Sequence, residues 1–480
     1  MFKEMRNKYK ELPLAVKASF WFLICSFIQK GIQVITTPIF TRIMPTAEFG
    51  KYNVFNSWLS IFTIFVSLNL SGGIFSQGLV KYEDDRRNYS FSMQILNLIL
   101  VIIALGVLLL FFSLGFVSKF QIIMMLFMLA IIWSNAVFNL WATEQRVNYK
   151  YRNIVALTIF SSIIIPFTSI LLIKLKLGGA FSRILSAAFW GSLLYGFIFI
   201  KQLNNGKRDY KKYWKHTFTM AIPLLPHYLS QTILNSSDRI MIEKMVGLSE
   251  AGIYSLAYSL SSIMILFNTA LVQTLTPYIF KKIKEKKIEV ISKVTFPALI
   301  FVAGVNILLM AFAPEVVAIF APSEYSNAIW IIPPVAMSVY FMFAYDLFVK
   351  FEFYYERTKL ISTATFIGAG INLILNFICI KKFGYMAAGY TTLICFIIYA
   401  VFHYVFMQKI CNKELNGVKP FNLKTLLIIT LVFLGFGFAI LAMYNYFAIR
   451  YAFILLILII LICNFKKIIA EAKTILDLRK

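Results

Sequence analysis

Fourteen long apolar runs fill most of this 480-residue chain and restrict it to one class of fold. A helix needs roughly 20 apolar residues to cross about 30 Å of hydrocarbon, at about 1.5 Å per residue. The pattern therefore predicts an all-α polytopic membrane protein with about 14 transmembrane helices. The runs lie near residues 14–41, 48–74, 90–116, 120–142, 153–174, 178–200, 217–243, 250–279, 292–320, 326–349, 358–380, 385–408, 423–446 and 448–465.

The charge pattern predicts how the chain crosses the membrane. Only 14% of the residues are charged, yet the net charge is +26, which in a soluble protein would suggest nucleic acid. Here most Lys and Arg residues collect in alternate connections, which are typically cytoplasmic. We therefore expect both termini to be cytoplasmic and expect no nucleic-acid partner. These basic segments are the N-terminus, 81–87, 146–152, 201–215, 281–293, 350–359, 409–424 and the tail from Lys466.

The residue types that usually carry catalysis or metal binding are sparse. The five cysteines and three histidines have no metal-ligand spacing and no disulfide framework. The chain also has no Walker phosphate loop, no Ser-centred nucleophile elbow and no HExxH stretch. We therefore expect no metal site, no cofactor and no enzymatic activity.

An internal repeat appears when the chain is shifted by about 202 residues. The segment PTAEFGKYNVFNSWLSI (45–61) then aligns with GLSEAGIYSLAYSLSSI (247–263), so that both carry Glu-x-Gly-x-Tyr. Chance similarity between apolar helices is the alternative explanation. Because each copy has six spans, an even number, both copies start on the same side of the membrane and the repeats are parallel. Transporters built from parallel repeats bind substrate near the midplane between their halves. We predict two parallel six-helix repeats around a central cavity, at 1–213 and 214–412, and two extra helices with a cytoplasmic tail at 413–480.

Polar residues on the first run predict one wall of that cavity. Ser26, Lys30, Gln33, Thr37 and Thr41 fall on one face of a helix with 100° per residue. A charge facing lipid at the centre of a span costs at least about 2.5 to 3.5 kcal/mol, so such residues normally face protein or water. We expect Lys30 and Gln33 to face the cavity, together with Arg42 near the end of the run, although Arg42 could instead snorkel to headgroups.

The seventh run is the repeat mate of the first and carries a second polar set. We predict substrate contacts by Gln231, Asn235, Arg239 and Lys244. The acidic residues Asp238 and Glu243 are candidates for ion coupling. Two alternatives stay open: an internal Asp238–Arg239 ion pair without a transport role, and snorkelling of Lys244.

Three features together resemble the Wzx-type polysaccharide flippases of the multidrug/oligosaccharidyl-lipid/polysaccharide exporter superfamily. They are the paired Glu-x-Gly-x-Tyr starts, the stretch LLPHYLSQTILNSSDRIMIEKMVGLSEAGIYSLAYSL (224–260) and FAPEVVAIFAPSEYSNAIWIIPPVAMS (312–338). The resemblance covers essentially the whole chain, including the number of spans. It is carried by a pattern along many spans and does not indicate which sugar is transported.

The resemblance implies a flippase of the bacterial cytoplasmic (inner) membrane. Its substrate would be an undecaprenyl-diphosphate-linked oligosaccharide, moved from the inner to the outer leaflet by alternating access for capsule, O-antigen or similar synthesis. A cavity with Lys and Arg suits a diphosphate, because it offers charge-assisted hydrogen bonds. Besides membrane lipid, the expected partners are Na⁺ or H⁺ as coupling ions and polysaccharide polymerase and assembly proteins. The alternatives are a multidrug or small-molecule exporter of the same superfamily and a membrane scaffold of a polysaccharide assembly complex.

Overall fold

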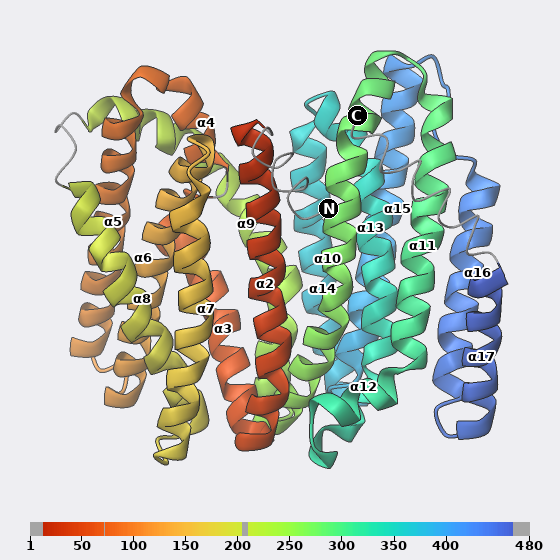
Figure 1. Ribbon diagram of the computed structural model, residues 1–480, viewed down its shortest axis with the longest axis horizontal. Helices are drawn as coiled ribbons and strands as arrows, with labels where there is room; N and C mark the ends of the chain where they lie inside the picture. Colours follow the sequence, from red (N-terminus) through yellow and green to blue (C-terminus); the bar gives the residue numbers. More distant parts are fainter. Residues whose placement is uncertain (1–12, 72, 204–209, 464–480) are drawn as a thin grey trace, which may run out of the picture. The chain divides into compact units, whose positions relative to one another are not determined.

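The computed structural model describes residues 13–71, 73–203 and 210–463, and within these residues all regular structure is helical. This confirms the predicted all-helical polytopic class. The chain forms two compact units, residues 1–232 and 233–480, and the boundary falls inside the long helix α9 (Lys211–Met245). Long helices run side by side within each unit (Figure 1). The predicted division at 213/214 and 412/413, which follows the repeat, stays a prediction.

Among the described residues of the first unit, seven α-helices precede α9, and local residues explain several of their ends. Pro45 precedes the first turn of α3, where its missing N–H costs nothing. After α3, Leu68 and Asn69 adopt left-handed backbone angles and stop the helix. Ser118 and Gln121 form a reciprocal capping box at the start of α6. The helices are α2 (Leu14–Ile43), α3 (Thr46–Ser67), α4 (Ile74–Lys81), α5 (Arg86–Ser113), α6 (Lys119–Val147), α7 (Tyr151–Lys174) and α8 (Gly179–Leu203).

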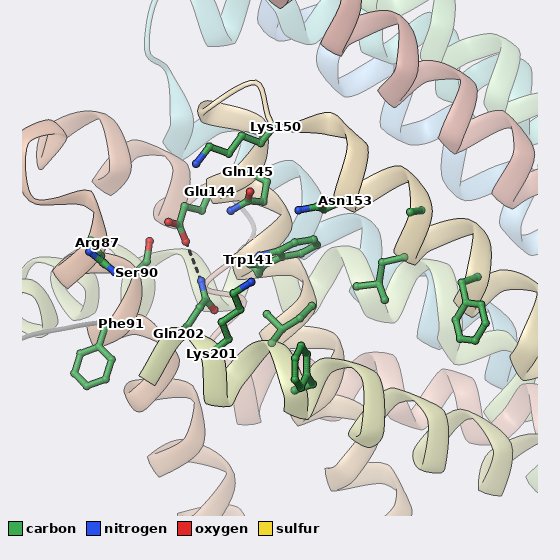
Figure 2. Close-up of a pocket in the computed structure, with 15 residues that line it drawn as sticks. Arg87, Ser90, Phe91, Trp141, Glu144, Gln145, Lys150, Asn153, Lys201 and Gln202 are labelled. Carbon is green, nitrogen blue, oxygen red and sulfur yellow. Dashed lines mark hydrogen bonds between the residues drawn. The ribbon is translucent and has the colours of Figure 1, made fainter. Parts of the chain in front are cut away.

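Within the first unit α8 is the central helix, because it packs against α6, α7 and α3. Helix α2 packs mainly on α7, and α5 packs on α6. A pocket remains among α5, α6, α7 and α8 at the end where α6 and α8 finish (Figure 2). It contains none of the predicted substrate or ion residues.

The second unit is built around α13, whose side chains are almost all buried. Helix α13 packs against α15, α10, α11 and α16, and α14 packs against α15. The helices are α10 (Leu248–Lys284), α11 (Ile291–Ala311), α12 (Ala313–Phe320), α13 (Ile332–Tyr354), α14 (Thr358–Phe383), α15 (Ala387–Glu414), α16 (Leu423–Ala442) and α17 (Phe447–Cys463).

Three packing pairs recur in the same helix order in the two units. The α6–α8, α7–α8 and α5–α6 packing of the first unit is matched by α13–α15, α14–α15 and α11–α13. The repeated glutamates also occupy similar places. Glu48 accepts a hydrogen bond from the Ala180 N–H at the start of α8, at 2.8 Å. Glu250 lies beside Tyr385, just before α15, where its charge adds to burial in raising the pKa of Tyr385.

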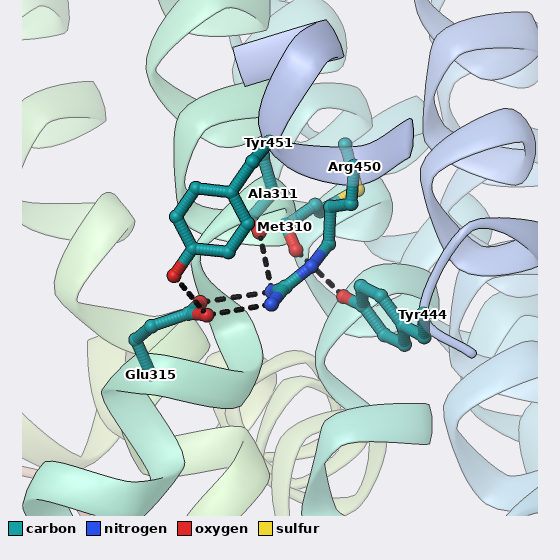
Figure 3. Close-up of polar contacts among 6 residues, drawn as sticks. All are labelled: Met310, Ala311, Glu315, Tyr444, Arg450 and Tyr451. Carbon is teal, nitrogen blue, oxygen red and sulfur yellow. Dashed lines mark hydrogen bonds and ion pairs between the residues drawn. The ribbon is translucent and has the colours of Figure 1, made fainter. Parts of the chain in front are cut away.

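The last two helices lie outside this repeat, and an ion pair ties α17 to α12 (Figure 3). Arg450 is 3% exposed and forms a two-pronged contact with Glu315, at 2.8 and 2.6 Å. It also donates to the Ala311 carbonyl at 3.1 Å, and the Tyr451 hydroxyl donates to Glu315 at 2.8 Å. Bidentate Arg–carboxylate pairs are among the stronger polar contacts in proteins.

Within the described residues, 11 helices are long and apolar enough to cross a membrane. Helices α3, α9 and α17 correspond to the other three predicted spans but are more polar or shorter. The count of fourteen therefore stays a prediction. Two predicted runs are interrupted: 48–74 ends as a helix at Ser67, and 292–320 divides into α11 and α12 at Phe312.

Candidate functional site

Lys30 lies on an exposed face of α2, far from both ends of that helix. Ser26 and Gln33 are exposed beside it on the predicted polar stripe, whereas Thr41 at the end of the stripe is buried. Among the described residues, no carboxylate forms an ion pair with Lys30. The ammonium of Lys30 is therefore available for an external anion within this unit.

Arg42 is a second cation on α2, in the last turn of the helix and four residues after a proline. Pro38 lies inside α2 and has no backbone N–H to donate to the preceding turn. The Arg42 side chain is exposed and donates to the Pro38 carbonyl at 3.0 Å. Arg42 is therefore bound to its own helix, and both predicted roles, substrate contact and snorkelling, stay open.

Arg183 is a cation in the first unit that the predicted substrate set did not contain. Its guanidinium carbon lies 3.5 Å from the ring centroid of Tyr52 and 4.0 Å from that of Phe40. Phe49 completes the aromatic surround at 5.9 Å. Such cation–π contacts hold a guanidinium in place without neutralising its charge. The contact joins α8 to α2 and α3, so sequence spacing could not reveal it.

The predicted residues of α9 have different surroundings. Gln231 is exposed, and Asn235 is half-buried one turn later. Arg239 donates to the Asn235 carbonyl at 3.0 Å and lies 4.3 Å from the Tyr258 ring centroid. Glu243 and the exposed Lys244 approach to 3.9 Å, a loose surface ion pair that contributes little to stability.

Asp238 is the most enclosed of these residues, being 0% exposed. Three neutral groups donate to its carboxylate: the Tyr254 hydroxyl at 2.6 Å, the Asn376 amide at 2.6 Å and the Thr392 hydroxyl at 3.0 Å. In the described part of the chain Arg239 donates to the Asn235 carbonyl and forms no salt bridge with Asp238, and the alternative of an internal ion pair stays open. Burying a carboxylate is costly unless hydrogen bonds or a cation compensate it.

Further polar groups extend this hydrogen-bond network beyond the Asp238 carboxylate. The Asn372 side-chain oxygen accepts from Ser237 at 3.2 Å and from Asn376 at 3.1 Å, and the Thr391 hydroxyl contacts Asn376. Among the described residues, no group of three His, Cys, Asp or Glu side chains could hold a metal. One carboxylate among amide and hydroxyl oxygens has the hard, weakly charged character that suits H⁺ or a monovalent cation better than a transition metal. We name this set the Asp238 network: Asp238, Tyr254, Asn372, Asn376, Thr391 and Thr392.

The features described so far define a class of protein. Two similarly built helical units, many apolar helices and polar groups buried within them are typical of a multi-pass membrane transporter. A family model described as polysaccharide biosynthesis protein matches residues 15–283. This covers more than half of the chain, and the chain belongs to that family. One relative and the structural neighbours described below are named as flippases or transporters.

Individual relatives agree with this assignment. A Haemophilus influenzae "uncharacterized membrane protein" is 21% identical over 75% of this chain and 88% of its own length. A Haloferax volcanii protein named "probable low-salt glycan biosynthesis flippase Agl15" is 27% identical over 32% of this chain and 34% of its own length.

Solved structures share the fold at low sequence identity. The lipid II flippase MurJ in an inward closed conformation has a TM-score of 0.65 and 16% identity, over 90% of this chain and 99% of its own. An inward-facing multidrug transporter of the MATE family has a TM-score of 0.60 and 14% identity, over 81% of this chain and 96% of its own. The fold therefore belongs to the group that contains both lipid flippases and drug transporters.

Proposed function

We propose that this protein flips an undecaprenyl-diphosphate-linked oligosaccharide from the inner to the outer leaflet of the bacterial cytoplasmic membrane. The product would be used for a surface polysaccharide such as a capsule or an O-antigen. The family assignment and the similarity to a glycan biosynthesis flippase support this class of substrate. The fold shared with a lipid II flippase supports the alternating-access mechanism.

Lys30 is the single observation that carries the substrate assignment. It is an exposed lysine in an apolar helix, and lipid is an unfavourable environment for its charge. A water-filled cavity that receives a diphosphate would solvate it and provide a partner for it. We propose that Arg42, Arg239 and Lys244 add positive charge there, while Gln33, Gln231 and Asn235 hydrogen-bond sugar hydroxyls.

Complementation of a flippase-null strain tests this role of Lys30. At matched protein levels Lys30→Arg should retain some transport, because the charge is kept. Lys30→Ala should lose a charge-assisted contact of roughly 1.5 to 3 kcal/mol, or about ten- to a hundredfold in apparent affinity. Lys119→Ala, at the exposed start of α6, is the matched control. If Lys30→Ala complements as well as the wild type, Lys30 is not part of the substrate path.

We further propose that Asp238 rather than Glu243 couples transport to Na⁺ or H⁺. Asp238 is buried among neutral donors, and a cation could replace them as its partner. Glu243 lies instead beside Lys244 at the surface. A unit charge that crosses the whole membrane gains about 2.3 kcal/mol per 100 mV, and an inside-negative potential drives an anionic substrate outward.

Proteoliposomes with imposed Na⁺, H⁺ or potential gradients test the coupling. Wild-type transport should respond to one cation gradient, and Asp238→Asn should lose that response while remaining folded. Glu243→Gln is the control and should keep the response. An unchanged response in Asp238→Asn would contradict the assignment of Asp238, whereas transport by the wild type would still support the flippase function.

The remaining functional candidates differ in what they would transport. A multidrug exporter is favoured by the shared MATE fold, and it would move cationic compounds. A scaffold for polysaccharide polymerase and assembly proteins would move nothing. An assay with labelled lipid-linked oligosaccharide therefore separates the flippase from the other two, and an assay with a cationic drug separates the exporter from the scaffold.

A further inference from the structure

A pocket of about 680 Å³ lies in the first unit, away from the predicted substrate residues. It is formed by the first turns of α5 and α7 and the last turns of α6 and α8 (Figure 2). Under the charge pattern of the loops, this end of the unit is cytoplasmic. The proposed transport mechanism assigns no task to this pocket.

One end of the pocket is polar and carries net positive charge. Arg87, Lys150 and Lys201 line it together with a single carboxylate, Glu144. Arg87 lies in the first turn of α5, and Lys150 directly precedes α7, so two helix N-termini add partial positive charge. An anion is therefore favoured here over a cation or a neutral molecule.

A hydrogen-bond chain fixes the back of this polar end. The Gln202 amide donates to Glu144 at 2.9 Å, and the buried Gln94 amide donates to the Gln202 oxygen at 2.8 Å. Gln94 also donates to the Val137 carbonyl at 3.2 Å. The chain links α5, α6 and α8, so Glu144 is held in position. Its carboxylate can accept hydrogen bonds from hydroxyl groups of a ligand.

The other end of the pocket is apolar and reaches the lipid-facing surface. Phe160 on α7 is 48% exposed, and Phe197 on α8 is 70% exposed. From Asn153 at the polar end to Phe160 is about two turns of α7, or roughly 10 Å along the helix. The pocket therefore changes from charged to apolar over the distance between a lipid headgroup and its first acyl carbons.

We propose that this pocket binds one anionic phospholipid of the adjacent leaflet, of the phosphatidylglycerol type. The phosphodiester lies against Arg87, Lys150 and Lys201, and the headgroup hydroxyls donate to Glu144. An acyl chain extends along Phe160 and Phe197. Phosphatidylethanolamine fits less well, because its ammonium cancels the phosphate charge in a pocket that is already positive. The inference does not depend on what the protein transports.

Native mass spectrometry of the full-length protein tests the site with defined lipids. The wild type should retain one phosphatidylglycerol in preference to phosphatidylethanolamine with the same acyl chains. The triple variant Arg87→Gln, Lys150→Gln, Lys201→Gln should weaken phosphatidylglycerol binding by about tenfold or more. The matched control Lys281→Gln, Lys284→Gln, Lys287→Gln removes equal charge from exposed positions of the second unit and should leave binding unchanged.

Two further variants keep the test valid if the triple variant does not fold. Lys150→Gln changes one exposed residue between α6 and α7 and should weaken binding several-fold without affecting folding. Glu144→Gln should reduce the preference for phosphatidylglycerol over phosphatidic acid, whose headgroup lacks the glycerol hydroxyls.

Four results would overturn the proposal. The first is equal phosphatidylglycerol retention by the Lys150→Gln variant, the triple variant and the control. The second is displacement of the lipid by soluble glycerol phosphate at equal concentration, which would identify a free-phosphate site. The third is an unchanged lipid preference in Glu144→Gln. Tighter retention of undecaprenyl phosphate than of phosphatidylglycerol would also count against it, by assigning the pocket to the carrier lipid.

Discussion

Replacing Arg450 by Ala should loosen the attachment of α17 to the rest of the second unit. The guanidinium contacts Glu315 through two hydrogen bonds and the Ala311 carbonyl through a third, and it is almost wholly buried. The substitution removes all three contacts and leaves the Glu315 carboxylate with only the Tyr451 hydroxyl as a side-chain donor.

The expected cost is about 3 kcal/mol in the free energy of unfolding. Removing one partner of a buried ion pair typically costs about 3 to 5 kcal/mol, because the other charge stays behind unpaired. The Glu315 side chain is 30% exposed, so water can partly solvate it and the lower end of that range applies. Arg450→Lys keeps the charge but loses the two-pronged geometry, and it should fall between the wild type and Arg450→Ala.

The pH dependence of the free energy of unfolding tests the same contact in a second way. Partial burial raises the pKa of Glu315, but hydrogen bonds from Arg450 and Tyr451 and the Arg450 charge outweigh it, so the pKa lies below its ordinary value of 4.5. A carboxyl with a lower pKa in the folded state adds stability above its unfolded pKa and loses it as the pH falls through the folded pKa. The difference between wild type and Arg450→Ala should therefore shrink below about pH 4.5.

Chemical or thermal unfolding of purified protein in one detergent, between pH 3 and pH 7, measures both effects. Proteolysis within residues 443–446, between α16 and α17, reports the local loosening. The matched control is Tyr446→Phe, because the Tyr446 side chain is exposed in this connection and takes no part in the Glu315 contacts. If Arg450→Ala unfolds like the wild type at neutral pH, the ion pair does not hold α17 in place.

Three other changes should alter stability in defined ways. His403→Leu leaves the buried Glu352 carboxyl without its 2.6 Å hydrogen-bond partner and should cost about 1 to 3 kcal/mol. Part of that cost should be recovered when Glu352→Leu is added, and unfolding curves of the single and double variants decide this. Gly78→Ala places a Cβ against the Tyr89 ring and should cost about 1 to 3 kcal/mol, whereas Gly106→Ala, with open space around it, should not destabilise the protein. Glu48→Ala removes the carboxylate contact at the α8 N-terminus and should cost about 0.5 to 2 kcal/mol, with equal stability of variant and wild type as the contradicting result.

The helical fold could be predicted because apolar run length alone limits what can cross a membrane. The two interrupted runs show where that reasoning fails. Residues 292–320 are mostly apolar, yet α12 begins afresh at Ala313, with Pro314 in its first turn. Proline also lies inside continuous helices, such as Pro38 in α2 and Pro297 in α11, so Pro314 alone did not mark this break. The end of α3 depends on the left-handed conformation of Leu68, which the leucine itself does not indicate.

The sequence could predict only those residues of the candidate site that lie together on one helix. Lys30 and Gln33 follow from helical periodicity, because both lie on α2. The Asp238 network draws its donors from α10, α14 and α15, up to 154 residues away in sequence. A single sequence has no spacing that connects such residues, and the same applies to Arg183 within its aromatic surround.

Direct measurement of lipid-linked oligosaccharide flipping in proteoliposomes tests the central claim. A fluorescent undecaprenyl-diphosphate oligosaccharide starts in one leaflet, and a membrane-impermeant reagent reports the fraction that reaches the other leaflet. The account predicts flipping by the wild type and by Lys119→Ala, and flipping slowed roughly tenfold or more in Lys30→Ala at a substrate concentration below saturation. Wild-type protein that moves a cationic drug but leaves the labelled lipid in its original leaflet would contradict the account.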